Sequence, residues 1–187
     1  GTIANVKLEY SRNGFLDELQ TVVVTASTPA APLSYAWTVV DAIGTNLKTR
    51  ASDAADAAVS DVSNAAFTIK GSLTVNAPNG AEVWNVGSSQ TIQWTRAGSI
   101  TFVELRYDTG AGTFPNVIVA STDADPLPAD NIGTFAWTIP DAVSATVKVR
   151  ATNTADTTVF DDSNANFKIR GSLTLTEREG GGTRVCI

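Results

Sequence analysis

The sequence contains no histidine and no methionine, and Cys186 is its only cysteine. A Ser-His-Asp triad and a Cys-His pair each need histidine, and a zinc site of the usual ligands needs several histidines or cysteines. All three kinds of site are therefore excluded. A disulfide within the chain is excluded as well. Cys186 is predicted to face outward, either as an incidental thiol or as a crosslink between neighbouring chains.

Charge and long apolar runs are also scarce. Charged residues make up 17% of the chain, and the net charge of −6 comes without any cluster of lysine and arginine that a phosphate backbone would need. No apolar run approaches the roughly 20 residues of a membrane-spanning helix. We therefore expect neither nucleic-acid binding nor membrane insertion. Plentiful Thr, Ala, Val, Ser and Asn favour short strands and turns.

Internal duplication dominates the sequence. Residues 34–75 align with residues 134–175 without a gap and with about half of the positions identical, and "GTIANVKLEY" (1–10) matches "GSITFVELRY" (98–107). Self-similarity of this kind indicates a repeat architecture. It predicts a complete repeat over residues 71–170, a partial repeat over 1–70 that lacks its first two strands, and the first strands of a further repeat over 171–187.

Within the complete repeat, apolar residues recur at every second position in short segments separated by turn residues. This period is typical of half-buried antiparallel strands. The segments are centred on residues 73–75, 92–94, 103–107, 135–139, 147–151 and 167–169. About seven strands in about 100 residues predict an all-β fold of tandem immunoglobulin-like (fibronectin-like) β-sandwiches.

The stretch "LTVNAPNGAEVWNVGSSQTIQW" (73–94) resembles the opening of a repeated surface domain of exported prokaryotic proteins, of the type PNGGExWxxG…IxW. It is also similar to the Ser/Thr-rich wall-anchored domain of fungal glucan-assembly proteins. The matching residues are Pro78, Asn79, Gly80, Glu82, Trp84, Gly87, Ile92 and Trp94, whereas Ala81 stands where a second glycine is usual. The resemblance implies an extracellular or cell-surface spacer or adhesive module without catalytic residues.

Acidic residues recur at matched places in the two repeats. Oxygen-rich loops at the end of a sandwich could bind calcium, which takes six to eight hard ligands. The calcium candidates are Asp141, Asp156, Asp161 and Asp162. Their spacing matches no known calcium loop, and aspartate is also a common turn former, so ordinary turn chemistry is the favoured interpretation and we predict no cofactor.

The four tryptophans are candidate sugar-stacking platforms, because a sugar ring packs against the face of an aromatic ring. Trp37, Trp94 and Trp137 fall on the inward phase of predicted strands and are expected in the core. Trp84 lies in a loop-like stretch and is the candidate ligand-binding residue. Catalysis is not expected: the adjacent Asp161 and Asp162 would point to opposite faces of a strand, whereas glycoside hydrolysis needs two facing carboxyl groups.

The partial repeats predict how the chain assembles. A sandwich without two strands exposes a sheet edge and part of its core, and strands from another chain would cover both. Three arrangements remain open: exchange of residues 171–187 between copies, a tandem array within a longer chain, or closure within one chain. The candidate assembly residues are Leu173, Leu175, Val185 and Ile187 on the donor side, and Val6 and Leu8 on the acceptor side.

Three functions follow from these observations. The first is a structural repeat of an extracellular filament, sheath or cell-surface stalk, with copies of itself as partners. The second is an adhesin or carbohydrate-binding module that contacts a cell-surface glycan. The third, and least favoured, is a non-catalytic part of a secreted enzyme. In each case the chain is predicted to be extracellular or at the cell surface, and not itself an enzyme.

Overall fold

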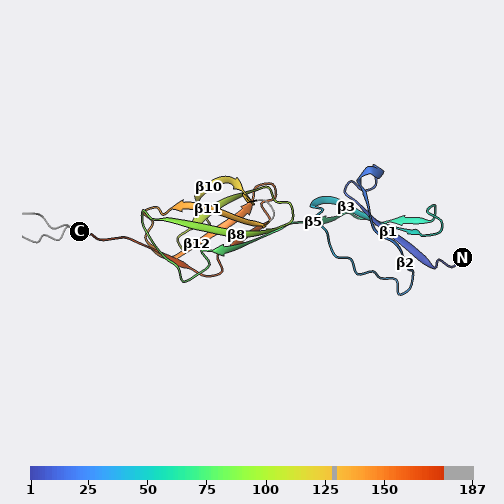
Figure 1. Ribbon diagram of the computed structural model, residues 1–187, viewed down its shortest axis with the longest axis horizontal. Coiled ribbons are helices and arrows are strands. Elements are labelled where there is room, and N and C mark those ends of the chain that lie inside the picture. Colours follow the sequence, from blue (N-terminus) through green and yellow to red (C-terminus); the bar gives the residue numbers. More distant parts are fainter. Residues whose placement is uncertain (128–129, 175–187) are drawn as a thin grey trace, which may run out of the picture. The chain divides into compact units, whose positions relative to one another are not determined.

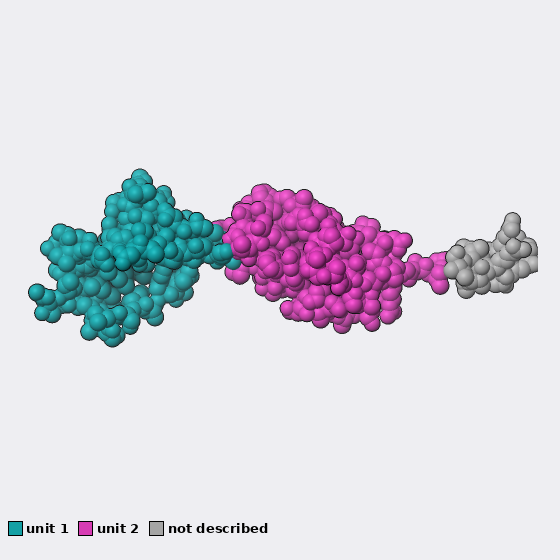
Figure 2. Space-filling view, turned by 180° about the vertical axis from the view of Figure 1, so that it is seen from behind, with its two compact units in different colours: residues 1–71 teal, residues 72–187 magenta. Residues whose placement is uncertain are grey.

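The computed structural model describes residues 1–127 and 130–174 (Figure 1). The chain divides into two compact units, unit 1 (Gly1–Gly71) and unit 2 (Ser72–Ile187), which Figure 2 draws in different colours. Apart from one short 3-10 helix, η1 (Glu18–Gln20), the regular structure of the described residues consists of strands. None of the described helical structure is long and apolar enough to cross a membrane.

Unit 2 is built from two sheets. The smaller sheet has the order β11-β8-β6 and comprises β11 (Ile132–Thr138), β8 (Ser89–Ala97) and β6 (Ser72–Ala77). The larger has the order β10-β9-β12-β14-β7, with β13 also paired to β12. Its strands are β10 (Asn116–Asp123), β9 (Phe102–Asp108), β12 (Ser144–Asn153), β14 (Phe167–Arg170), β7 (Val83–Asn85) and β13 (Phe160–Asp162). Neighbouring strands are antiparallel, except that β14 and β7 are parallel.

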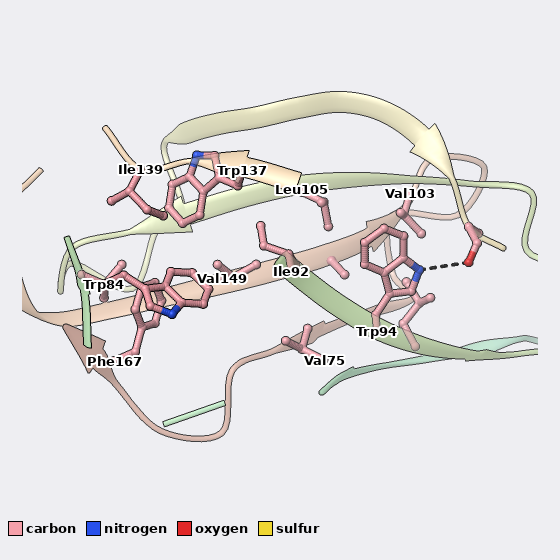
Figure 3. Packing of buried hydrophobic residues seen from close by; sticks show 14 of the residues in the cluster. Val75, Trp84, Ile92, Trp94, Val103, Leu105, Trp137, Ile139, Val149 and Phe167 are labelled. Carbon is pink, nitrogen blue, oxygen red and sulfur yellow. Dashed lines mark hydrogen bonds between the residues drawn. The ribbon is translucent and has the colours of Figure 1, made fainter. Parts of the chain in front are cut away.

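The core of unit 2 fills the space between these sheets. Residues of period two point inward, so that Ile92 and Trp94 on β8 face Val103 and Leu105 on β9, and all four are fully buried (Figure 3). The indole Nε1 of Trp94 donates a hydrogen bond of 3.1 Å to the backbone oxygen of Ala124. A buried Trp that satisfies its only polar atom in this way contributes its whole ring to the core.

The predicted all-β sandwich is confirmed by this unit. The described part of unit 2 holds nine strands rather than about seven. Two of the nine, β7 and β13, have only three residues each, which is too short to produce a period-two pattern in the sequence.

Unit 1 contains one sheet in its described residues. Its order is β2-β1-β3-β4, with β5 also paired to β3. The strands are β1 (Asn5–Ser11), β2 (Thr21–Pro29), β3 (Gly44–Asp53), β4 (Ser60–Val62) and β5 (Phe67–Ile69). By sequence and by register, they correspond in order to β9, β10, β12, β13 and β14 of unit 2. The larger sheet is therefore repeated in unit 1, without its β7 strand.

Residues 34–40 of unit 1 form no strand and are drawn as a plain trace in Figure 1. Their counterparts in unit 2, residues 134–140, include most of β11, which pairs along its whole length with β8. Unit 1 has no counterpart of β8 in its described residues, so the backbone of residues 34–40 has no neighbouring strand with which to pair. A strand needs such a partner to satisfy its backbone groups.

Candidate assembly groove in the incomplete unit

An apolar groove of about 480 Å³ lies in unit 1, against the face of the sheet that would be covered in a complete sandwich. Its lining is largely aliphatic and aromatic. The residues that form it are Gly1, Ile3, Val6, Leu8, Thr28, Pro29, Ala30, Leu33, Ser34, Tyr35 and Ala51. We call this feature the unit 1 groove. A second hollow of about 250 Å³ continues it along β1 and β3 as far as Trp37.

The duplicated sequence shows what this face looks like when it is covered. Val103, Leu105 and Ala151 of unit 2 are each 0% exposed beneath the β11-β8-β6 sheet. Their counterparts in unit 1 are the half-buried Val6 and Leu8 and the exposed Ala51. The same residue types in the same strands therefore lose their cover in unit 1, and an apolar surface that is fully buried in unit 2 is partly open to solvent in unit 1.

The far end of the same sheet is closed by aromatic packing within unit 1. The ring of Trp37 stands 5.2 Å from that of Tyr10 and 6.3 Å from that of Phe67, centroid to centroid. Tyr10 is 3% exposed, and Leu47 is completely buried beside it in the same cluster. Unit 1 therefore has a small closed core at one end of its sheet and the open groove at the other.

A charged network lies beside the groove on β1 and β3. Glu9 is 4% exposed and accepts from Lys7 Nζ at 2.6 Å and from Arg50 Nε at 3.0 Å. Burial opposes the ionisation of Glu9, but the hydrogen bonds from Lys7 and Arg50 outweigh it, so the pKa of this carboxyl lies below its ordinary value. Arg50 also donates two hydrogen bonds to Glu18. The network joins β1, β3 and η1 through charged hydrogen bonds.

The four calcium candidates have other partners or lie apart. Asp161 accepts the backbone N–H of Val75, Asp162 accepts two hydrogen bonds from Arg150, and Asp156 accepts the N–H and hydroxyl of Thr158. Asp141 is exposed in the turn between β11 and β12. No group of three or more metal-ligating side chains is found among the described residues. The favoured interpretation, turn chemistry without a cofactor, stays a prediction, and calcium binding stays its alternative.

The expectation that Trp84 is an exposed sugar platform is wrong. Trp84 is 8% exposed, and its ring lies 6.2 Å from that of Trp137 and 4.9 Å from that of Phe167 (Figure 3). The reason is the short strand β7, which runs parallel to β14 and turns Trp84 into the core. The other three tryptophans lie in or against the cores, as expected. The glycan-binding alternative therefore loses the aromatic residue on which it rested.

The assembly candidates are placed in part. Val6 and Leu8 line the groove together, from neighbouring inward positions of β1. Leu173 lies outside any strand and is 86% exposed, whereas its counterpart Leu73 in β6 is 6% exposed. Three further candidates, Leu175, Val185 and Ile187, and also Cys186, lie outside the described residues.

Of the residues that line the groove, the sequence analysis named only Val6 and Leu8, and Ala51 and Tyr35 are among those that it missed. Both could have been found from the duplication, because Ala151 and Phe135, their counterparts, lie at period-two positions of the complete repeat. A residue that is apolar in both copies, and whose covering strand exists in only one, is expected to be exposed in the other.

No family model matches this sequence, and no curated protein matches it. Among solved structures, it is similar to one described as "Structures of Clostridium thermocellum CbhA fibronectin(III)-like modules", with 20% identity over 96% of this chain and 86% of that chain, at a TM-score of 0.39. A second, described as "Crystal structure of the titin domains z1z2 in complex with telethonin", has 15% identity over 92% of this chain and 85% of that chain, at a TM-score of 0.31. At these levels neither neighbour bears on function.

Proposed function

We propose that this chain is a structural repeat of an extracellular filament, sheath or cell-surface stalk, in which the unit 1 groove of one copy is completed by residues 171–187 of a second copy. Repetition of this contact from copy to copy gives a head-to-tail polymer. Complete and shared sandwiches then alternate along it, because a contact between two different surfaces does not close on itself.

The observation that carries the proposal is the contrast between Ala51, which is exposed, and Ala151, which is 0% exposed. The same alanine on the same strand is covered only where β6 and β8 are present. An apolar face and an unpaired strand edge of this kind are what strand addition covers in other complexes.

The sequence of residues 171–175 supports this segment as the occupant of the groove. "GSLTL" (171–175) differs from "GSLTV" (71–75) only at its last position, and residues 72–75 lie in β6, where Leu73 and Val75 pack into the core of unit 2. Ser172, Leu173 and Thr174 are described, exposed and outside any strand. The described part of this segment therefore forms no strand within its own copy, as donation to a second copy requires.

The extracellular location is part of the same proposal. The resemblance of residues 73–94 to surface repeats of exported proteins supports it.

Sedimentation velocity of the purified full chain over a range of concentrations tests the proposal. We expect polymers that grow with concentration and that disappear when residues 171–187 are deleted. A peptide of residues 71–97, which carries β6 and β8, is expected to occupy the groove and to block polymerisation.

Two substitutions test whether assembly depends on the groove or on surface charge in general. Ala51→Arg places a long charged side chain on the floor of the groove and is expected to abolish assembly, whereas Ala57→Arg, on an exposed turn between β3 and β4, is expected to leave it unchanged. A native chain that binds the peptide but stays a monomer would contradict exchange between copies and favour a tandem array. A chain that neither assembles nor binds the peptide would refute the groove itself.

A further inference from the structure

In unit 2, strand β6 lies at the edge of its sheet and is held on its open side by side chains of the other sheet. The backbone N–H of Val75 donates to Asp161 Oδ2 at 2.7 Å, across 86 residues of sequence. Three positions further along, the hydroxyl of Ser163 donates to the backbone oxygen of Pro78 at 2.7 Å. Asp161 lies on β13, so the first bond joins the larger sheet to the edge strand, and the second joins the residues that directly follow β13 and β6.

Unit 1 has the same two side chains without the strand that they would hold. Asp61 lies on β4 directly opposite Ala51, as Asp161 lies on β13 opposite Ala151. Asp61 is exposed, and within the described part of the chain its carboxylate has no hydrogen-bond partner. The hydroxyl of Ser63 donates instead to the nearby backbone oxygen of Ala65 at 3.2 Å.

We propose that Asp61 anchors the edge of the incoming strand, by accepting the backbone N–H of residue 175 of a second copy. This assignment rests on the proposed function, and it adds a side-chain contact at the open edge of that strand. Residue 175 is the counterpart of Val75, and it lies outside the described residues.

The register of the incoming strand is set by its side chains, which alternate between the two faces of a strand. A slip of one residue would turn Leu173 and Leu175 away from the groove and bring Ser172 and Thr174 into it. Asp61 strengthens the contact and does not select the register, because a carboxylate accepts the backbone N–H of whichever residue lies opposite it.

The test compares the full native chain with Asp61→Ala and, as a matched control, Asp161→Ala. Sedimentation velocity gives the assembly Kd, and amide hydrogen exchange gives the protection of residue 175 in the assembled state. Loss of one hydrogen bond to a charged acceptor predicts about a 10-fold to 100-fold rise in the assembly Kd for Asp61→Ala. The amide of residue 175 is expected to be protected in the native polymer and to exchange rapidly in the Asp61→Ala polymer.

The control removes the same carboxylate from the complete unit. Asp161→Ala is expected to speed exchange at Val75 and to lower the melting temperature of unit 2, with the assembly Kd unchanged. Asp61 is exposed, so its replacement leaves the fold of unit 1 intact, which the circular dichroism spectrum of the variant checks.

The outcomes separate the two proposals. If Asp61→Ala assembles like the native chain, or if residue 175 is equally protected in both, the assignment to Asp61 is overturned and the proposed function stands. If the native chain does not assemble at all, the proposed function fails and the assignment fails with it.

Discussion

Replacing Leu173 by alanine removes one apolar side chain from the donor segment and leaves the acceptor untouched. On assembly Leu173 is expected to pass from 86% exposed to the 6% of its counterpart Leu73 in β6. Burial of a leucine side chain is worth about 1.5–3 kcal/mol, and truncation to alanine gives up most of this. We therefore expect a loss of about 2 kcal/mol per contact, which is about a 30-fold rise in the assembly Kd.

Sedimentation velocity over two decades of concentration measures this shift. Leu19→Ala is the matched control, because Leu19 is 89% exposed in η1 and does not line the groove. Both variants delete the same atoms from an exposed position, so a general effect of surface hydrophobicity would move them together. We expect only Leu173→Ala to weaken assembly.

Two results would refute this reasoning. The first is an equal shift for Leu173→Ala and Leu19→Ala, which would mean that assembly follows non-specific apolar association. The second is an unchanged Kd for Leu173→Ala in a chain that does polymerise, because the polymer would then use a contact other than a β6-like strand in the groove.

The period-two pattern predicted the sandwich because its strands are half-buried, with one face toward the core. Ile92, Trp94, Val103 and Leu105 alternate with polar residues, and each is completely buried in unit 2. The burial of Trp84 was not predicted, because β7 spans only three residues and pairs in parallel with β14. A segment so short shows no alternation, and its place depends on a strand more than 80 residues away in the sequence.

The state of residues 34–40 could not be read from their own sequence either. "YAWTVV" and "FAWTIP" are similar strings that share Ala, Trp and Thr, yet only the second includes part of a strand. The difference lies in the partner, because β11 pairs with β8 and the described part of unit 1 has no such strand. Strand propensity describes a fit to a sheet that already exists, and tertiary context decides whether it does.

The sequence predicted that unit 1 has an uncovered apolar face, but not every contact that this face offers. Comparison of the repeats indicated that two strands were missing from unit 1, and hence that Val6 and Leu8 would lose their cover. The exposure of Ala51 follows from its counterpart Ala151, whereas the contact proposed for Asp61 became visible only from the cross-strand pairing of β3 with β4 and its exact repetition in β12 and β13. Pairing register is a property of three-dimensional structure, which the alternation of a single strand does not report.

Two further predictions concern the complete unit. In Gly133→Ala the added Cβ would collide with the buried indole of Trp94, so we expect a loss of about 2 kcal/mol and a melting temperature lower by about 10 °C; Gly171→Ala, whose Cβ would meet no atom within 4 Å, is expected to melt like the native chain. The second prediction is that the free energy of unfolding depends on pH in the acid range. Burial disfavours the charged form of Asp108, but the backbone N–H groups that donate to its carboxylate outweigh burial and lower its pKa below the ordinary 3.8. A lowered pKa stabilises the fold at every pH above 3.8, and this contribution is lost as the pH falls through the lower folded-state value. Urea unfolding at pH 7 is therefore expected to show a loss of about 3 kcal/mol for Asp108→Ala, because two hydrogen bonds of 2.8 Å to a charged acceptor disappear. A second variant, Asp108→Ser, is suggested by unit 1. There the counterpart of Asp108 is Ser11, whose neutral hydroxyl accepts two backbone N–H groups. Asp108→Ser should keep part of the stability at pH 7 and lose this acid dependence, and an acid dependence equal to that of the native chain would show that another carboxyl is responsible.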